Sequence, residues 1–233
     1  MKNLQKLAFA LILVSCTVLY ASGQTMKERV DEAKVVKVYF KNAPIKHSPH
    51  TGQDIASGRP GTGCESFGET TPLPAEYTDA VNGIIDLLNK GFNTTAFVAG
   101  DFSKVPLRTS GMLKGEPDWA TLNEPLMFFV STWGEYAVIR NTEGGKQNSF
   151  AMDSYLIIYY IKDGKLKIFD QKSLASKRME PIKTQNCDNY DYFVKKFPTN
   201  SLLDAFKAAF IKNTNEFITK DMKKYEKAMS KKK

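Results

Sequence analysis

Residues 154–171, SYLIIYYIKDGKLKIFDQ, predict a β-hairpin, and therefore a fold built around a sheet. The dipeptide Asp163-Gly164 between two apolar runs is a strong signal for a tight turn with positive backbone φ angles. Side chains of a strand point alternately to its two faces, and both sets are apolar or aromatic in the first strand of this hairpin. Such a strand is typical of the middle of a sheet, with both faces covered.

Two amphipathic helices flank the region of predicted strands, at residues 73–91 and 201–229. Apolar residues recur in both at intervals of three and four positions, as expected for a helix with one buried face. Gly91 is expected to end the first helix in the left-handed conformation. The other expected elements are strands at 34–42 and 94–100, a short helix within 115–125, and a strand pair at 126–141 that turns around Thr132–Gly134.

These elements predict an α+β fold. Its sheet should be mostly antiparallel, because the strongest strand signals follow one another directly, and the helices at 73–91 and 201–229 should pack on one face of it. We find no internal repeat and no linker that would divide the chain, so residues 24–233 are expected to form a single exported globular domain with a basic carboxyl-terminal tail at 220–233.

Residues 1–23 have the pattern of a secretory signal: Lys2 and Lys6, a short apolar run, and small residues at its exit. Cleavage after Gly23 would make Gln24 the new amino terminus. The alternative is that Leu13–Cys16 forms a lipobox and that Cys16 carries a lipid. Either way we expect export to the periplasm or the extracellular space, with a lipid anchor to the outer membrane in the second case.

The net charge of +8 belongs mainly to the two ends of the chain. Removing Lys2 and Lys6 leaves +6, and residues 220–233 contribute seven lysines against two acidic residues, or +5, so the body carries +1. A nearly neutral body argues against a nucleic-acid partner. The basic tail is expected to be mainly a solvated helix end. Membrane contact is expected only through that tail or a lipid anchor.

Both histidines and one cysteine lie in a loop expected at residues 47–64, HSPHTGQDIASGRPGTGC. His47 and His50 could contribute to a metal site, but zinc needs three or four ligands and this pair would need help from neighbouring acidic residues or Cys64. Two solvated loop histidines are the simpler interpretation. The glycines lack the spacing and the lysine of a phosphate-binding loop.

Cys64 and Cys187 are expected to form a disulfide. They are the two thiols that remain once the signal is removed or Cys16 is lipidated, and an even pair in an exported chain is usually bridged. The bridge would close a loop of 123 residues, from 187 − 64, and would remove Cys64 as a nucleophile or metal ligand. It therefore argues against a hydrolase.

Aromatic side chains cluster in the predicted strands, and Trp133, Tyr155 and Tyr159 are candidates for contact with a ligand. Aromatic rings on a sheet can form a platform for sugars, although such residues usually belong to the core. The order of elements from Val35 to Met229 resembles the amino-terminal periplasmic domain of the TolB proteins and related envelope-assembly lipoproteins. This resemblance is architectural and assigns no residue a role.

Together these features predict an exported envelope protein with a non-catalytic binding or assembly role and no cofactor. Its partner would be a protein or small molecule of the cell envelope. The alternative is a small metal-dependent or Cys/His hydrolase with its site in loop 47–64, and a third hypothesis is a surface adhesive module that uses the aromatic hairpin.

Overall fold

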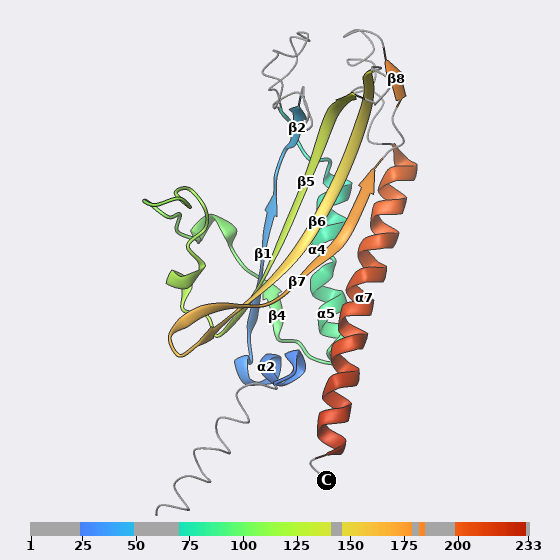
Figure 1. Ribbon diagram of the computed structural model, residues 1–233. Coiled ribbons are helices and arrows are strands. Elements are labelled where there is room, and N and C mark those ends of the chain that lie inside the picture. The colour runs from blue at the N-terminus through green and yellow to red at the C-terminus, as the bar shows by residue number, and fades with distance from the viewer. Residues whose placement is uncertain (1–23, 49–69, 141–145, 179–181, 185–198, 232–233) are drawn as a thin grey trace, which may run out of the picture.

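The structure is a computed structural model that describes residues 24–48, 70–140, 146–178, 182–184 and 199–231. The described strands form one strongly curled sheet, accompanied by helices (Figure 1), so the α+β class is confirmed. The strands are β1 (Val36–Asn42), β2 (Ile45–Ser48), β3 (Thr70–Thr71), β4 (Phe97–Ala99), β5 (Leu126–Arg140), β6 (Lys146–Lys162), β7 (Lys165–Arg178) and β8 (Ile182–Thr184).

The antiparallel pair β5–β6 runs through the centre of the sheet. Its register joins Leu126 to Tyr160 at one end and Arg140 to Lys146 at the other. The far edge of β5 is shared by β1 and β2, which follow one another along it, and the far edge of β6 is shared by β7 and β8. The expectation that the first strand of the predicted hairpin lies inside the sheet is confirmed.

The sheet is mixed, so the expectation of a mostly antiparallel sheet is wrong. β1 pairs parallel with both β4 and β5, and β2 pairs parallel with β5. The cause is a crossover: the chain leaves β1, passes through the helices of residues 75–91 and returns to form β4 in the same direction. Parallel neighbours need such a connection, which the order strand, helix, strand already contained.

The helix expected at 73–91 is present as α4 (Ala75–Asn82) and α5 (Ile84–Gly91), interrupted at Gly83. Glycine has a low helix propensity, which accounts for the break. Gly91 does not adopt the left-handed conformation; Asn93 does, with φ of 49°. Gly91 instead allows close packing, since a Cβ there would lie 2.6 Å from the side chain of Ile218.

The turn predicted at Asp163-Gly164 is confirmed, with φ angles of 53° and 69° that fit a two-residue hairpin. The turn expected around Thr132–Gly134 is wrong, because β5 continues through these residues without a break. Gly134 lies within the strand because the neighbouring strands approach it closely. A Cβ at this position would lie 2.6 Å from the sulfur of Met152 and 2.9 Å from the Ile45 side chain.

The helix predicted at 201–229 is α7 (Asn200–Ser230), which runs alongside β7 in Figure 1. Its buried residues recur every three or four positions and include Phe206, Phe210 and Phe217. Phe206 meets Tyr77 of α4, and Phe217 meets Phe92. Among the described helices, none combines the length and the apolar character needed to cross a bilayer.

Among the described residues, buried side chains form two separate clusters. The main cluster joins the helices to alternate residues of the central strands, including Phe128, Leu156 and Ile158. The second cluster contains the intervening strand residues Met127 and Phe129 together with Tyr39, Val105 and Trp119. Two short 3₁₀ helices, η1 (Phe102–Lys104) and η2 (Trp119–Leu122), belong to the segment that supplies Val105 and Trp119.

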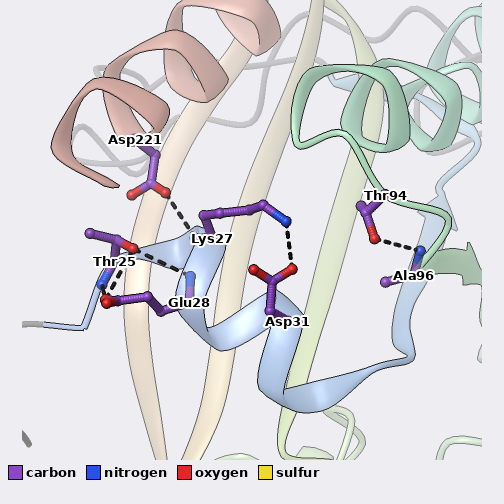
Figure 2. A network of polar contacts seen from close by, with 7 residues as sticks. All are labelled: Thr25, Lys27, Glu28, Asp31, Thr94, Ala96 and Asp221. Atoms are coloured by element: carbon purple, nitrogen blue, oxygen red, sulfur yellow. Dashed lines mark hydrogen bonds and ion pairs between the residues drawn. The ribbon is translucent and has the colours of Figure 1, made fainter. Parts of the chain in front are cut away.

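A short amino-terminal helix, α2 (Met26–Ala33), is fixed to α7 by one buried carboxylate (Figure 2). Asp221 accepts hydrogen bonds from the backbone N–H groups of Met26 at 3.2 Å and Lys27 at 3.0 Å. Thr25 and Glu28 form a capping box at the same helix end, with a 2.9 Å bond from the Thr25 N–H to the Glu28 carboxylate. The N–H groups at the start of α2, which have no acceptor within the helix, thus bond to Asp221 of α7 and to local side chains.

Replacing Asp221 by alanine should destabilise the protein, because two backbone N–H groups would lose their acceptor in a site where the Asp221 residue is 5% exposed. We expect a loss of about 1–3 kcal/mol in the free energy of unfolding, measured by chemical denaturation. Asp221→Asn should lose less, since its amide oxygen can still accept. A variant Asp221→Ala as stable as the wild type would contradict this role.

The stability difference between the wild type and Asp221→Asn should also depend on pH. Burial raises the pKa of Asp221 above its ordinary value of 3.8, although the bonds from Met26 and Lys27 act in the opposite direction. A group with a raised pKa in the folded state stabilises the fold most when protonated, and this contribution is lost as the pH rises through the folded pKa. The wild type should therefore gain stability relative to Asp221→Asn between about pH 7 and about pH 4. A constant difference across that range would contradict the raised pKa.

Candidate functional site

Part of one sheet face carries side chains that belong to neither buried cluster. Residues paired directly across neighbouring strands point to the same face of a sheet. This rule places two adjacent rows of residues on the face that also carries Met127 and Phe129. We call them the open face; the rows are Lys41–Ser131–Tyr155–Ser173 and Trp133–Asp153–Ser176.

Trp133 and Tyr155 stack on one another at the centre of the open face. Their ring centroids lie 5.3 Å apart and the rings are inclined by only 13°. They come from β5 and β6, on diagonal positions of the antiparallel ladder. Tyr155 is 39% exposed and Trp133 is half-buried. Aromatic residues this large are usually buried, so a stacked pair that reaches the surface through Tyr155 indicates a contact surface.

The open face adjoins the second cluster, which covers the same face farther along the strands. Tyr159 lies there: its ring stacks on Trp119, with centroids 5.7 Å apart and an inclination of 25°. Burial raises the pKa of Tyr159. Of the three aromatic residues singled out in the sequence, the structure therefore brings Trp133 and Tyr155 together and covers Tyr159 with the segment that carries η2.

A partly buried polar contact holds the second cluster to the sheet. The hydroxyl group of Tyr39 donates to the carboxylate of Glu124 at 2.8 Å, and Lys37 approaches the same oxygen at 2.7 Å. Burial, followed by Glu124, raises the pKa of Tyr39. Gly100 allows the approach, since a Cβ there would lie 2.7 Å from the Tyr39 ring. These contacts hold Tyr39, and with it part of the second cluster, in place.

Charges of both signs surround the aromatic pair. Lys41 is exposed and Asp153 is half-buried, and the row beyond Trp133 pairs Lys46 of β2 with Glu135 of β5. Serine residues at 131, 173 and 176 add hydroxyl groups. The open face thus offers many hydrogen-bond donors and acceptors with little net charge.

His47 lies in strand β2, not in a solvated loop as expected. It is 6% exposed, and its Nε2 lies 2.8 Å from the hydroxyl oxygen of Thr71. Its ring meets the ring of Tyr136 with centroids 5.1 Å apart. Burial raises the pKa of Tyr136 to about 12. The residue forms part of the packed interior at this end of the sheet, where it contacts β3 and β5.

The other sequence-predicted sites fall outside the described residues: His50 and Cys64 of the loop, Cys187, and Cys16 of the signal region. The disulfide, lipidation and metal-site hypotheses therefore stay predictions. Within the described part of the chain, no group of three or more histidine, cysteine or acidic residues could hold a metal ion.

Sequence reasoning missed Trp119 and Phe102, which lie in the segment between β4 and β5. Trp119 is 5% exposed and contacts the rings of Tyr39, Phe129 and Tyr159. Phe102 stacks on Phe129 with centroids 5.9 Å apart. A signal was present: a segment rich in glycine and proline that nevertheless retains a tryptophan and a phenylalanine has apolar anchors to bury.

The two tryptophan residues should differ in their effect on stability. Trp119→Ala should lower the free energy of unfolding by about 3–5 kcal/mol, as expected for a large buried aromatic residue. Trp133→Ala should lower it by only about 0.5–1.5 kcal/mol, the value of one aromatic pair. Denaturant titrations of both variants provide the measurement. Equal losses would show that Trp133 also belongs to the core.

Comparison with known proteins identifies no family. No protein-family model and no curated protein matches the chain. One solved structure with some similarity is a hypothetical protein from Chlamydia trachomatis, with 13% identity, a TM-score of 0.31, and coverage of 79% of this chain and 98% of the other. Another is a homolog of the neuraminyllactose-binding hemagglutinin from Helicobacter pylori, with 13% identity, a TM-score of 0.29, and coverage of 85% and 91%.

Proposed function

We propose that this protein is an exported, non-catalytic binding protein of the cell envelope and that its ligand contacts the open face. In this proposal the helices α4, α5 and α7 cover the opposite face of the sheet and supply the stability. The observation that carries the proposal is the exposed stack of Trp133 and Tyr155, which neither buried cluster requires.

The ligand that fits best is a carbohydrate. Because the two rings stack on each other, each has one remaining face and its edge to offer a ligand. The apolar face of a sugar ring can cover such a surface, and burial of about 60 Å² of apolar area contributes roughly 1.5 kcal/mol. Rings that are already stacked also lose little conformational freedom on binding.

The polar surroundings of the stack favour the same class. Sugar hydroxyl groups both donate and accept hydrogen bonds, and the serine hydroxyls and the Asp153 carboxylate provide partners for them. Nucleic acids and other polyanions would require a strongly basic surface. The exposed Lys41 is offset by the nearby Asp153, so the open face lacks this character.

An array of neutral and acidic oligosaccharides tests the proposal, followed by calorimetric titration with the best ligand found. Trp133→Ala and Tyr155→Ala should each weaken binding by about fivefold or more, since each removes an aromatic contact with the ligand that contributes about 1–3 kcal/mol. The unfolding transition of each variant, measured in parallel, shows that it remains folded.

Ile211→Ala is the matched control, because Ile211 is an exposed apolar residue, at 47%, on α7. It should bind as the wild type does. Failure of the protein to bind any oligosaccharide on the array would contradict the carbohydrate proposal. A ligand whose affinity is unchanged in both aromatic variants would show that binding occurs elsewhere than on the open face.

Export also makes a prediction about covalent structure. We propose cleavage after Gly23 and a disulfide between Cys64 and Cys187, on the sequence argument alone. The intact mass of protein from its own host should correspond to residues 24–233 less two hydrogen atoms, and non-reducing peptide mapping should recover both cysteines in one linked peptide. A diacyl or triacyl adduct on Cys16 would identify a lipoprotein instead. Separate cysteine peptides, alkylated without reductant, would rule out the bridge.

A further inference from the structure

The segment between β4 and β5 projects from the body of the protein as an ordered loop (Figure 1). Its two arms meet at an isolated bridge between Leu107 and Pro117. The N–H of Arg108 bonds to the carbonyl of Glu116, and the N–H of Gly115 returns to the carbonyl of Arg108, both at 2.9 Å. Below this point Val105 and Trp119 lie in the second cluster. The loop is therefore anchored at its base.

The tip of this loop, residues 107–114, exposes three apolar side chains among polar and basic residues. Met112 is 104% exposed, Leu107 57% and Leu113 52%. Positive φ angles at Gly111 and Gly115 shape the turn, which closes with a 3.2 Å bond from the Lys114 N–H to the Gly111 carbonyl. A tip with this much internal bonding displays its apolar side chains to solvent in a fixed arrangement. Exposure of such residues together marks an interaction surface.

The charges of the loop are divided between tip and base. Arg108 and Lys114 are the charged residues of the tip, and both are basic. Acidic residues begin directly below the tip. The exposed Glu116 lies opposite Arg108, Asp118 approaches Arg108 at 4.0 Å, and at the base Asp101 is paired with Lys104 at 3.2 Å. An apolar tip with a basic border is complementary to the headgroup layer of an anionic membrane.

We propose that the tip inserts Leu107, Met112 and Leu113 into the interfacial region of a bilayer containing anionic lipid. This contact is distinct from the lipid anchor and the basic tail expected from sequence, and it does not depend on carbohydrate binding at the open face. A protein partner fits less well, because a stable protein interface buries about 800 Å² on each side. Three projecting side chains cannot provide that area, whereas a bilayer accepts a protruding tip.

Fluorescence of a tryptophan placed in the tip tests insertion directly. The probe is unilamellar vesicles of phosphatidylcholine with and without phosphatidylglycerol, carrying brominated acyl chains as quenchers. The variant Leu113→Trp should show a blue-shifted, quenched emission with the anionic vesicles, after subtraction of the wild-type signal. The matched variant Ile211→Trp, which replaces an exposed residue of α7, should show neither change. This readout reports the tip even if another part of the full chain holds the protein on the vesicle.

Vesicle cosedimentation of a Cys16→Ser background measures the contribution to affinity. Met112→Asp with Leu113→Asp should lower the partition coefficient at least about tenfold, since it replaces two inserted apolar side chains by charges. Val35→Asp with Ile211→Asp adds the same charges at exposed residues outside the loop and the basic tail, and should leave the coefficient within about twofold. Lys114→Gln should reduce the preference for anionic vesicles about fivefold.

An unchanged, unquenched emission from Leu113→Trp would overturn the proposal, whether or not the protein binds the vesicles. Equal losses in the tip variant and the control double variant would also overturn it, because the effect would then be one of net charge. Insertion without any preference for phosphatidylglycerol would refute the role assigned to Arg108 and Lys114.

Discussion

The pairing of β5 with β6 is the constraint on which the rest of the structure depends. Its register continues without a break from Leu126–Tyr160 to Arg140–Lys146, and every other described strand except β3 and β4 pairs with one of these two. A slip by one residue would exchange the two faces of the strand and place Trp133 where Thr132 is now buried. Close packing at Gly134 opposes such a slip, since a side chain moved to this position would meet Met152 and Ile45.

This register separates the residues of the main cluster from those of the open face. One set of alternate residues, including Phe128 and Leu156, is fully buried in the main cluster. The other set is apolar where the loop segment covers it and polar where nothing described does, so that Phe129 and Ser131 differ sharply although they are neighbours on one face. Substitutions in the first set should lower stability more than those at Trp133 and Tyr155, which lie outside both buried clusters.

The fold class and the main helices could be predicted because their signals are local. Asp163-Gly164 and the apolar stripe of α7 each depend on residues within one element. The parallel pairings could not be predicted in the same way, because the sequence of β1 does not indicate which strands lie beside it. The turn wrongly expected at Thr132–Gly134 also reflects a tertiary effect. Gly134 is needed there because Met152 and Ile45 pack closely against it, whereas the local sequence pattern predicts a turn.

The candidate site could be predicted in part. Alternation of side chains placed Tyr155 and Tyr159 on one face, which is correct, but it could not show that Trp119 covers the second of them. The projecting tip escaped notice for the opposite reason. Met112 and Leu113 are ordinary residues in sequence, and they become significant only because the bonds of Arg108 with Gly115 and Glu116 hold them away from the core.

Trp119 links these two surfaces. It packs against Tyr159 on the sheet and anchors the loop whose tip lies a few residues before it. The loop can present apolar side chains to solvent because its own apolar anchors are already buried, and the same burial ends the covered part of the sheet face where the open face begins. A single aromatic cluster therefore determines how much of the sheet remains accessible and how firmly the tip is displayed.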